Sequence, residues 1–356
     1  MWPDRRLCEL LGIEHPIIQA PMAGSATPAL AAAVSNAGGL GSLGCAGLDA
    51  AGVAAVATEL RSATNKPFNL NFFVHPKPTN DPVTLAAART RLAPWYAALG
   101  LGEPPEALPD LGPGFDAARL ATLLVLRPKV VSFHFGLPEA EAVAQLKAAG
   151  CVILSTATTV AEARALEAGG ADAIIAQGWE AGGHRGSHVP RAPADGIGTL
   201  ALVPQVVDAV RLPVIAAGGI GDGRGIAAAL ALGACGVQLG TAFLTCPEAG
   251  TDAPRRELLR HASDSDTMMT EAFSGRAARA RRSRYAPDLD RRRQALPDFP
   301  SLYALSDPLI EAGRDDEASF HLYGQAAAMG RALPAADLLA WLVGETRAIL
   351  ARLSRG

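Results

Sequence analysis

The sequence predicts an α/β protein built as a closed (β/α)8 TIM barrel, and three observations support this prediction. Eight short apolar runs alternate with helical patterns between residues 17 and 239. Most of these runs lack the polar alternation of a half-exposed strand, which is typical of a parallel sheet covered on both faces. The first run is followed by Pro21-Met-Ala-Gly-Ser25 rather than G-x-G-x-x-G, which disfavours an open dinucleotide-binding sheet. Eight strand–helix units are the number that closes a barrel.

The expected strands are eight short segments along the first two thirds of the chain. They are residues 17–20, 40–43, 68–74, 130–133, 151–154, 172–176, 213–217 and 236–239. The third strand differs from the others because Asn69 and Asn71 interrupt its apolar run. Buried amides need hydrogen-bond partners, so these two residues call for a specific environment.

The helices between these strands carry recognisable start and stop signals. They are expected at residues 28–37, 49–62, 138–149, 158–168, 199–210 and 222–232. Thr27 is the expected N-cap of the first helix, with Pro28 at its first position and Gly38-Gly39 behind its end. Asp222 is the expected N-cap of the last.

Two segments do not fit the alternating pattern. Residues 75–127 hold many prolines and are too long for a single crossover. Residues 242–356 form a long tail that ends in an amphipathic helix, 335–353, expected to pack on the barrel or on a second subunit, which leaves a homodimer open. The predicted organisation is a barrel from residues 1–74 and 128–245, a helical insertion at 75–127, and a helical extension on the substrate side at 246–356.

An Arg-rich stretch covers residues 276–293 within this tail. It can be interpreted as an anion-binding or partner-binding patch, or as a solvated helical face or loop. Asp288 and Asp290 interrupt the basic run, and acidic residues balance it elsewhere, so the solvated face is the favoured interpretation.

Composition indicates an ordinary globular protein with a large core. Apolar residues make up 49% of the 356 residues and charged residues 19%, so disorder is not expected to dominate. The formal net charge is −3, because 32 basic residues nearly balance 35 acidic ones. This balance argues against general binding to nucleic acid or to a membrane surface.

The cysteines and the N-terminal residues indicate the cellular compartment of the protein. Five scattered cysteines form no C-x-x-C pair and no His cluster has zinc spacing, so reduced thiols and no metal site are expected. Met1 is followed by Trp-Pro-Asp-Arg-Arg rather than an apolar segment, so no signal peptide is expected. The longest apolar runs are too short to span a bilayer. The resulting expectation is a cytoplasmic protein.

Functional residues of such a barrel lie where its strands end. These ends carry Ala20 to Ala23, Gly41-Ser42, Asn71, His134, Ser155-Thr156, Gln177, Gly218-Gly219 and residues 238–241. Glycine lets backbone N–H groups approach an anion, and the next helix adds a favourable dipole, so the glycines after the seventh and eighth strands predict a phosphate site. Tight strand-to-helix turns are the alternative. The nearby amides suit the edge of a flavin, although a phosphorylated sugar or nucleotide would satisfy them too.

The most distinctive stretch is the loop after the sixth strand. Residues 178–187 read Gly-Trp-Glu-Ala-Gly-Gly-His-Arg-Gly-Ser. A buried strand that ends in a glycine-rich loop with polar residues is typical of a site of chemistry. The flanking glycines would let His184 lie close to a ligand without side-chain clashes. The alternative for His184 is that it only orders the loop.

Several motifs together resemble the nitronate monooxygenase family, formerly called 2-nitropropane dioxygenases. They are Pro16-Ile-Ile-Gln-Ala-Pro-Met-Ala23, Gly38-Gly-Leu-Gly-Ser-Leu-Gly44, Asn71-Phe-Phe-Val74, Gln177 to Gly186, Pro213-Val-Ile-Ala-Ala-Gly-Gly-Ile220 and Val237-Gln-Leu-Gly-Thr-Ala-Phe243. The resemblance covers roughly residues 13–245. It implies an FMN-containing (β/α)8 barrel with an added helical domain, in agreement with the strand count.

The resemblance also implies residue roles. The family's catalytic histidine falls on His184, and Tyr323-Gly-Gln325 resembles a terminal turn that closes over the cofactor. His134, Tyr303 and Tyr323 are candidates for the substrate pocket. Residues implied to hold FMN are Met22, Ala23, Asn71, Gln177, Gly182, Gly218, Gly219, Gln238, Leu239, Gly240 and Thr241.

The implied reaction oxidises an alkyl nitronate, or a nitroalkane through its nitronate, to a carbonyl compound and nitrite. O2 is the oxidant and FMN the electron carrier. His184 could donate a hydrogen bond to the nitronate or accept the α-proton of a neutral nitroalkane, because the ordinary histidine pKa lies near working pH. Glu180 is expected to bind backbone N–H groups and Trp179 to fill a hydrophobic space. Arg185 is expected to contact phosphate or solvent.

Two other functions stay open. One is an NAD(P)H-dependent flavin reductase on the same fold, an enoyl-acyl carrier protein reductase or a quinone reductase. The insertion at 75–127 and the strand Asn71-Phe-Phe-Val-His75 favour the nitronate enzymes. The other is a phosphate-binding barrel without flavin or catalysis.

Overall fold

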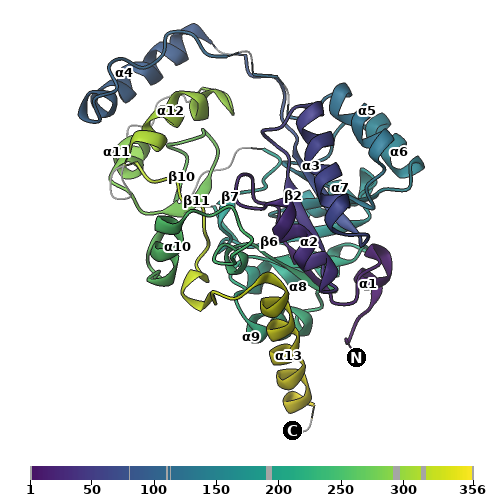
Figure 1. Cartoon of the computed structure of the whole chain (residues 1–356). Helices are drawn as coiled ribbons and strands as arrows, with labels where there is room; N and C mark the ends of the chain where they lie inside the picture. The colour runs from purple at the N-terminus through teal and green to yellow at the C-terminus, as the bar shows by residue number, and fades with distance from the viewer. Residues whose placement is uncertain are drawn as a thin grey trace.

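A closed parallel barrel forms the centre of the molecule (Figure 1). The computed structural model describes residues 2–79, 81–109, 111–112, 114–189, 195–291, 297–313 and 318–354. The sheet order is β1-β9-β8-β6-β5-β4-β3-β2. A parallel bridge between Ile18 and Leu40 joins the two outer strands and closes the barrel. The predicted fold class is therefore confirmed.

All eight expected strands are present, with ends that differ by no more than three residues from the predicted ones. They are β1 (Ile17–Gln19), β2 (Gly41–Gly44), β3 (Phe68–Phe73), β4 (Val130–His134), β5 (Val152–Ala157), β6 (Ala173–Gln177), β8 (Val214–Ala217) and β9 (Gly236–Leu239). Burial on both faces explains their mostly apolar character. Alternate residues serve two cores: Ile17 packs toward the helices, whereas Ile18 faces the barrel interior with Leu7 and Leu11.

The expected helices surround the barrel. They are α2 (Pro28–Asn36), α3 (Ala50–Ala63), α6 (Ala140–Ala148), α7 (Val160–Ala168), α8 (Thr199–Ala209) and α9 (Gly223–Ala231). Thr27 caps α2 by accepting from the N–H of Leu30 at 3.0 Å. Asp222 caps α9 through the N–H groups of Arg224 and Gly225. Both predicted caps are therefore confirmed.

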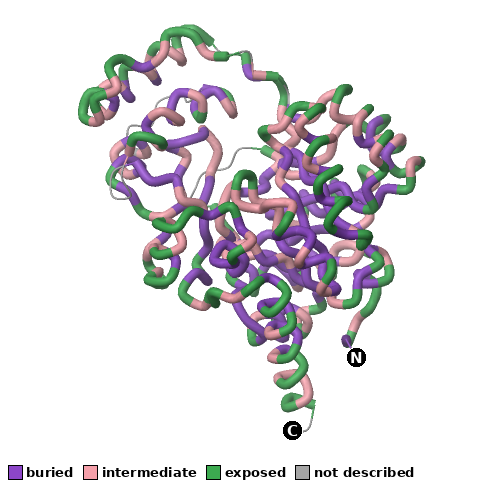
Figure 2. The backbone as a smooth tube through the Cα atoms, viewed as in Figure 1, coloured by how far each residue is buried: buried purple, intermediate pink, exposed green. Residues whose placement is uncertain are grey.

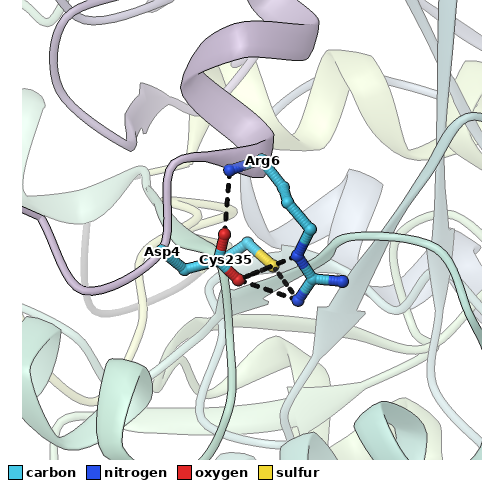
Figure 3. Close-up of polar contacts among 3 residues, drawn as sticks. All are labelled: Asp4, Arg6 and Cys235. Carbon is cyan, nitrogen blue, oxygen red and sulfur yellow. Dashed lines mark hydrogen bonds and ion pairs between the residues drawn. The ribbon is translucent and has the colours of Figure 1, made fainter.

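A short helix, α1 (Arg6–Leu11), covers the N-terminal end of the barrel, and a polar cluster fixes it there (Figure 3). Cys235, just before β9, donates from Sγ to Asp4 and accepts from Arg6, both at 3.0 Å. Hydrogen bonds from Arg6 lower the pKa of Asp4 to about 2. Burial and the hydrogen bond to Asp4 raise the pKa of Cys235 to about 11, so the thiol stays protonated and continues to donate.

The segment between β3 and β4 contains two helices with different partners. α4 (Pro82–Ala98) packs on α12 (Ser301–Ala312), where Tyr96 donates from its hydroxyl to the carbonyl of Leu305 at 2.8 Å. α5 (Ala117–Leu126) lies against α3 and α6 and so belongs to the ring of helices around the barrel. The outer face of α4 is exposed in Figure 2, and Val83 there is 76% exposed.

The C-terminal region contains a second sheet that the sequence did not predict. It has the order β10-β11-β7, made of Thr267–Thr270, Ala278–Arg281 and Gly183–His184. The strand β7 lies inside the glycine loop, and His184 is paired with Ala278. α10 (Ala253–Arg260), α11 (Tyr285–Arg291) and α12 lie beside this sheet, next to the barrel in Figure 1.

The favoured interpretation of the Arg-rich stretch, a solvated face, is wrong for its first part. Arg279 lies in β11, is 3% exposed, and donates to the carbonyl of Trp179 at 2.9 and 3.1 Å. Arg276 is partly buried and stacks on Phe135. Pairing of β11 with β7 draws both side chains inward, and charge content alone does not reveal this pairing. Arg292 and Arg293 lie outside the described residues.

The last helix, α13 (Ala335–Leu353), packs on α9 and α2, which is one of its two expected positions. Its far end extends beyond the barrel in Figure 1, where Leu353 is 65% exposed. Two 3-10 turns complete the elements, η1 (Thr241–Phe243) and η2 (Ala327–Met329). None of the helices that the structure describes combines the length and apolar character needed to cross a membrane.

Candidate active site

The C-terminal ends of neighbouring strands bring the predicted site residues together. Phe73 of β3 is paired with His134 of β4, and Gln177 ends β6. Asn71 is buried, and its amide donates to the hydroxyl and the carbonyl of Ser132 on β4 at 2.9 and 3.2 Å. The barrel therefore supplies a rigid base on which the glycine loop rests.

Gln177 and His134 hold the glycine loop from this base. Gln177 donates from Nε2 to the carbonyl of His184 at 3.0 Å and accepts from the N–H of Gly186 at 2.8 Å. His134 reaches the same carbonyl from Nε2, also at 3.0 Å, and a carbonyl can only accept. The other ring nitrogen of His134 therefore accepts from the hydroxyl of Thr156, 3.1 Å away. Both side chains fix the backbone of residue 184.

The imidazole of His184 lies within a ring of aromatic side chains. Its centroid is 5.5 to 6.1 Å from those of Phe73, Phe135, Phe299 and Phe320. Burial, followed by the charges of His134 and Arg276, lowers the pKa of His184 to about 3. Burial likewise lowers the pKa of His134 to about 4. The argument that His184 titrates near working pH is therefore wrong: both imidazoles are neutral there.

Ser274, in the segment between β10 and β11, orients the ring of His184. Its hydroxyl lies 2.9 Å from Nε2 of His184 and donates to the carbonyl of Arg276 at 3.1 Å. A hydroxyl has one proton, so this geometry makes His184 the donor to Ser274 through Nε2–H. The remaining nitrogen, Nδ1, is then an unprotonated acceptor.

The other polar residues of the glycine loop hold the fold together. Glu180 accepts from the N–H and the hydroxyl of Thr199 at 2.9 and 2.8 Å, which confirms its expected role. Arg185 is 6% exposed and donates to the carbonyl of Gly178 at 2.6 Å, so it does not face solvent. Trp179 packs between Arg185 and Arg279, whose guanidinium groups lie 5.5 and 5.7 Å from its ring.

The turn at Tyr323 to Gln325 closes against the glycine loop. The N–H of Gln325 donates to the carbonyl of Glu180 at 3.0 Å, and the N–H of Gly324 donates to the hydroxyl of Thr241 at 2.9 Å. A Cβ on Gly182 would lie 2.4 Å from the carbonyl carbon of Tyr323. Position 182 therefore needs glycine because this turn packs on it.

The three candidates for the substrate pocket lie at different depths. His134 is next to His184. Tyr303 contacts the set of four phenylalanines at Phe320, and the centroids of these two rings are 6.0 Å apart. Tyr303 is 38% exposed and lies at the rim. Tyr323 is buried in a separate apolar cluster with Leu244 and Leu259, so the structure does not place its side chain beside His184.

The rim at β8 and β9 has features that suit a phosphate-bearing group. Gly218 and Gly219 have φ values of 102° and 70°, which side chains rarely adopt. Within the described ranges, the N–H groups of Gly219 and Gly240 have no backbone acceptor. The first amides of α9 are already bonded to Asp222 and Glu345, so the glycine turn rather than the helix would face an anion.

The remaining rim residues also fit a bound heteroaromatic group. Among the described residues, the buried Oε1 of Gln238 has no hydrogen-bond partner. Met22 lines the space above Gly240, where a Cβ would meet its Sδ at 3.5 Å. Ala23 is exposed beside it. Leu239 is buried in the core, so only its backbone can contribute.

Sequence reasoning missed the aromatic ring, Ser274 and Arg276. The four phenylalanines come from separate segments and share no motif. The conformation of Phe135, at the end of β4, becomes visible only in the structure, where this non-glycine residue has a φ of 74°. Such a conformation often marks a functional position. Ser274 and Arg276 precede β11, which was not expected.

Comparisons with known proteins agree with this arrangement. A family model described as nitronate monooxygenase matches residues 4–345. The chain is 47% identical over 355 residues to a nitronate monooxygenase of Paraburkholderia phytofirmans, covering 98% of this chain and 97% of that protein. It is 48% identical over 353 residues to one of Pseudomonas aeruginosa, covering 96% and 99%. A nitroalkane oxidase structure from Streptomyces ansochromogenes superposes with a TM-score of 0.89 at 41% identity, covering 98% and 99%.

Proposed function

The chain belongs to the nitronate monooxygenase family, and from this premise we propose that it oxidises alkyl nitronates with O2 to a carbonyl compound and nitrite, with FMN as cofactor. The observation that carries the proposal is the position of His184. Its ring lies above the strand ends, within four phenylalanines, and on a loop that the barrel holds by its backbone. These side chains would form a preorganised site for a small reactive anion.

FMN would be held along the rim from β9 to β3. The turn at Gly218-Gly219 and the N–H of Gly240 would face its phosphate, because they offer N–H groups without acceptors. The free Oε1 of Gln238 and the amides of Asn71 and Gln177 would face the polar edge of the ring system. When bound, the flavin supplies the redox chemistry, and the protein positions the substrate.

His184 would act on the substrate as a neutral imidazole. Nε2–H is committed to Ser274, which leaves Nδ1 as an acceptor toward the pocket. With a pKa of about 3, this nitrogen is a poor base for removing a carbon-bound proton from a neutral nitroalkane. The site therefore favours a preformed nitronate over a nitroalkane that must first be deprotonated.

The aromatic ring around His184 would keep water away from the reacting carbon. Phe73 and Phe135 come from the barrel, whereas Phe299 and Phe320 come from the C-terminal region. A site with few waters strengthens every electrostatic contact to an anionic substrate. The aromatic set thus joins the two parts of the chain into one pocket.

We also propose a cytoplasmic location. All five cysteines are buried and free, which fits a reducing compartment. The high thiol pKa values that burial gives Cys45 and Cys246, about 12 each, leave them protonated and unreactive.

An oxygen-electrode assay tests the proposed function. Purified protein is supplied with ethyl nitronate, propionate 3-nitronate or nitroethane, while nitrite is measured and NADH oxidation is followed in parallel. The proposal expects flavin absorbance, oxygen uptake and nitrite with the nitronates. NADH oxidation without nitrite would instead support a flavin reductase, and a colourless, inactive protein would support a phosphate-binding barrel.

A further inference from the structure

Arg276 lies at the edge of the aromatic set around His184. Its guanidinium carbon is 4.0 Å from the ring centroid of Phe135 and 5.9 Å from that of Phe299. Both rings are within 6.1 Å of the His184 ring. Nη1 donates to the carbonyl of Ser187 at 3.1 Å, which leaves most of the five guanidinium protons for other acceptors. Arg276 is thus a cation held in place beside the pocket.

The charge of Arg276 has no compensating carboxylate in the described part of the chain. No ion pair joins it to an acid there, and burial alone lowers its pKa. The neighbouring buried arginines differ: Glu162 and Glu180 act on Arg185, and Glu180 acts on Arg279. Arg276 also lowers the pKa of His75, His134 and His184, so its field reaches the whole pocket. A half-buried cation without a counter-charge is costly unless a ligand supplies one.

We infer that Arg276 is the residue that selects the anionic substrate, because its guanidinium binds the two oxygens of a nitronate, which carry a net negative charge, more tightly than the uncharged nitro group of a nitroalkane. This inference rests on the proposed function. The planar guanidinium fork matches two oxygens of a planar nitronate, as it matches a carboxylate. The stacked phenylalanines hold the fork in one orientation, so little side-chain freedom is lost on binding.

The test compares two variants of the FMN-loaded protein with a charge control. Arg276→Met removes the charge but keeps a long unbranched side chain. Arg276→Lys keeps the charge but loses the planar guanidinium group. Arg284→Met removes a charge from the exposed end of the same segment. For each protein, KM and kcat are measured with ethyl nitronate and with nitroethane. The affinity for nitrate, a planar unreactive anion, is measured by isothermal titration calorimetry, which does not depend on turnover.

The expected result is a KM for ethyl nitronate at least about 10-fold higher in Arg276→Met, which corresponds to about 1.4 kcal/mol. Nitrate affinity should fall by a similar factor, while KM for nitroethane changes less than about threefold. Arg276→Lys should recover much of both losses, and Arg284→Met should match the wild type. If Arg276→Met does not fold, the wild type must still bind nitrate and Arg276→Lys must bind it more weakly.

Two results would overturn the inference. Unchanged nitronate KM and nitrate affinity in a folded Arg276→Met protein would show that the residue binds no substrate anion. An equal fall of kcat with both substrates, at constant nitrate affinity, would place the charge of Arg276 against the cofactor instead. Failure of the proposed function is separate, because the wild type would then oxidise no nitronate at all.

Discussion

The imidazole of His134 donates from Nε2 to the backbone carbonyl of His184, with 3.0 Å between the nitrogen and the oxygen. Gln177 donates to the same carbonyl at the same distance. The position of the His184 ring therefore depends on two side chains at the ends of β4 and β6, each held within the barrel. His134 was expected as a candidate for the substrate pocket, and from this hydrogen bond we infer that it positions His184.

Replacing His134 tests this positioning role. In His134→Leu, the carbonyl of His184 loses one donor and the hydroxyl of Thr156 loses its partner. The free energy of unfolding should fall by about 1–3 kcal/mol as a result. We expect kcat/KM for a nitronate to fall about 10-fold or more. His134→Gln, whose amide can donate to the carbonyl, should recover part of the loss. Wild-type kcat/KM in the leucine variant, measured by oxygen uptake, would rule out the role.

The neutral histidines make stability depend on pH. The folded-state pKa values of His184 and His134, about 3 and 4, lie below the ordinary value of 6.5, and burial lowers those of His15 and His75 in the same direction. The unfolded chain therefore binds more protons once the pH falls below 6.5. Stability is complete above that pH and is lost as the pH falls, by up to about 1.4 kcal/mol per unit for each histidine.

Urea denaturation at pH 7.5 and 5.5 measures this loss. We expect the free energy of unfolding to be about 2–3 kcal/mol lower at the lower pH. His134→Gln should make the dependence shallower. The control is His261→Gln, since the side chain of His261 is 77% exposed, and it should leave the dependence unchanged. Equal stability of the wild type at both pH values would contradict the buried, neutral state of the two site histidines.

Gly182 tests the packing of the C-terminal turn. A Cβ there would lie 2.4 Å from the carbonyl carbon of Tyr323 and 2.5 Å from the nitrogen of Gly324, both backbone atoms. Gly182→Ala should therefore destabilise the protein by about 1–3 kcal/mol and increase hydrogen exchange at residues 323–327. Gly344→Ala is the matched control in α13, where nothing lies within 4 Å. It should be stabilising by about 0.5–1 kcal/mol.

Gly219 tests the predicted phosphate site. Gly219→Asp would place a negative charge beside the turn, so the FMN content of the purified protein should fall well below that of the wild type. Gly219→Asn has the same shape and tolerates the same positive φ of 70°, so it should retain more cofactor. The ratio of flavin to protein absorbance measures both. Full occupancy in the aspartate variant would move the phosphate away from this turn.

The barrel could be predicted because short stretches of sequence indicate each of its strands and helices. A parallel strand is a continuous apolar run, and Thr27 and Asp222 mark helix starts by their side-chain chemistry. Strand ends then converge at one edge, so His134, Gln177 and Gly218 could be grouped without coordinates. Most of the predicted site residues followed from one rule, that the functional residues of a parallel barrel lie at the C-terminal ends of its strands.

The rest of the site depends on pairings between distant segments. The strand β7 has two residues, Gly183 and His184, and no sequence pattern marks its pairing with β11. That pairing buries Arg279, although the sequence placed it in a run of charges expected to be exposed. It also brings Ser274 into contact with His184. The pKa of His184 could not be predicted either, because phenylalanines from four segments produce the burial that lowers it.

Oxygen uptake by His184→Asn tests the central claim most directly. Asparagine keeps a polar group of similar reach but lacks the ring that the aromatic set encloses and that Ser274 orients. With ethyl nitronate as substrate, we predict that the variant retains its FMN and folds normally. We expect kcat/KM to fall at least about 100-fold, because the ring that helps to position the substrate is lost. An FMN-loaded variant with wild-type kcat/KM and nitrite yield would contradict the account, because His184 would then have no part in the reaction.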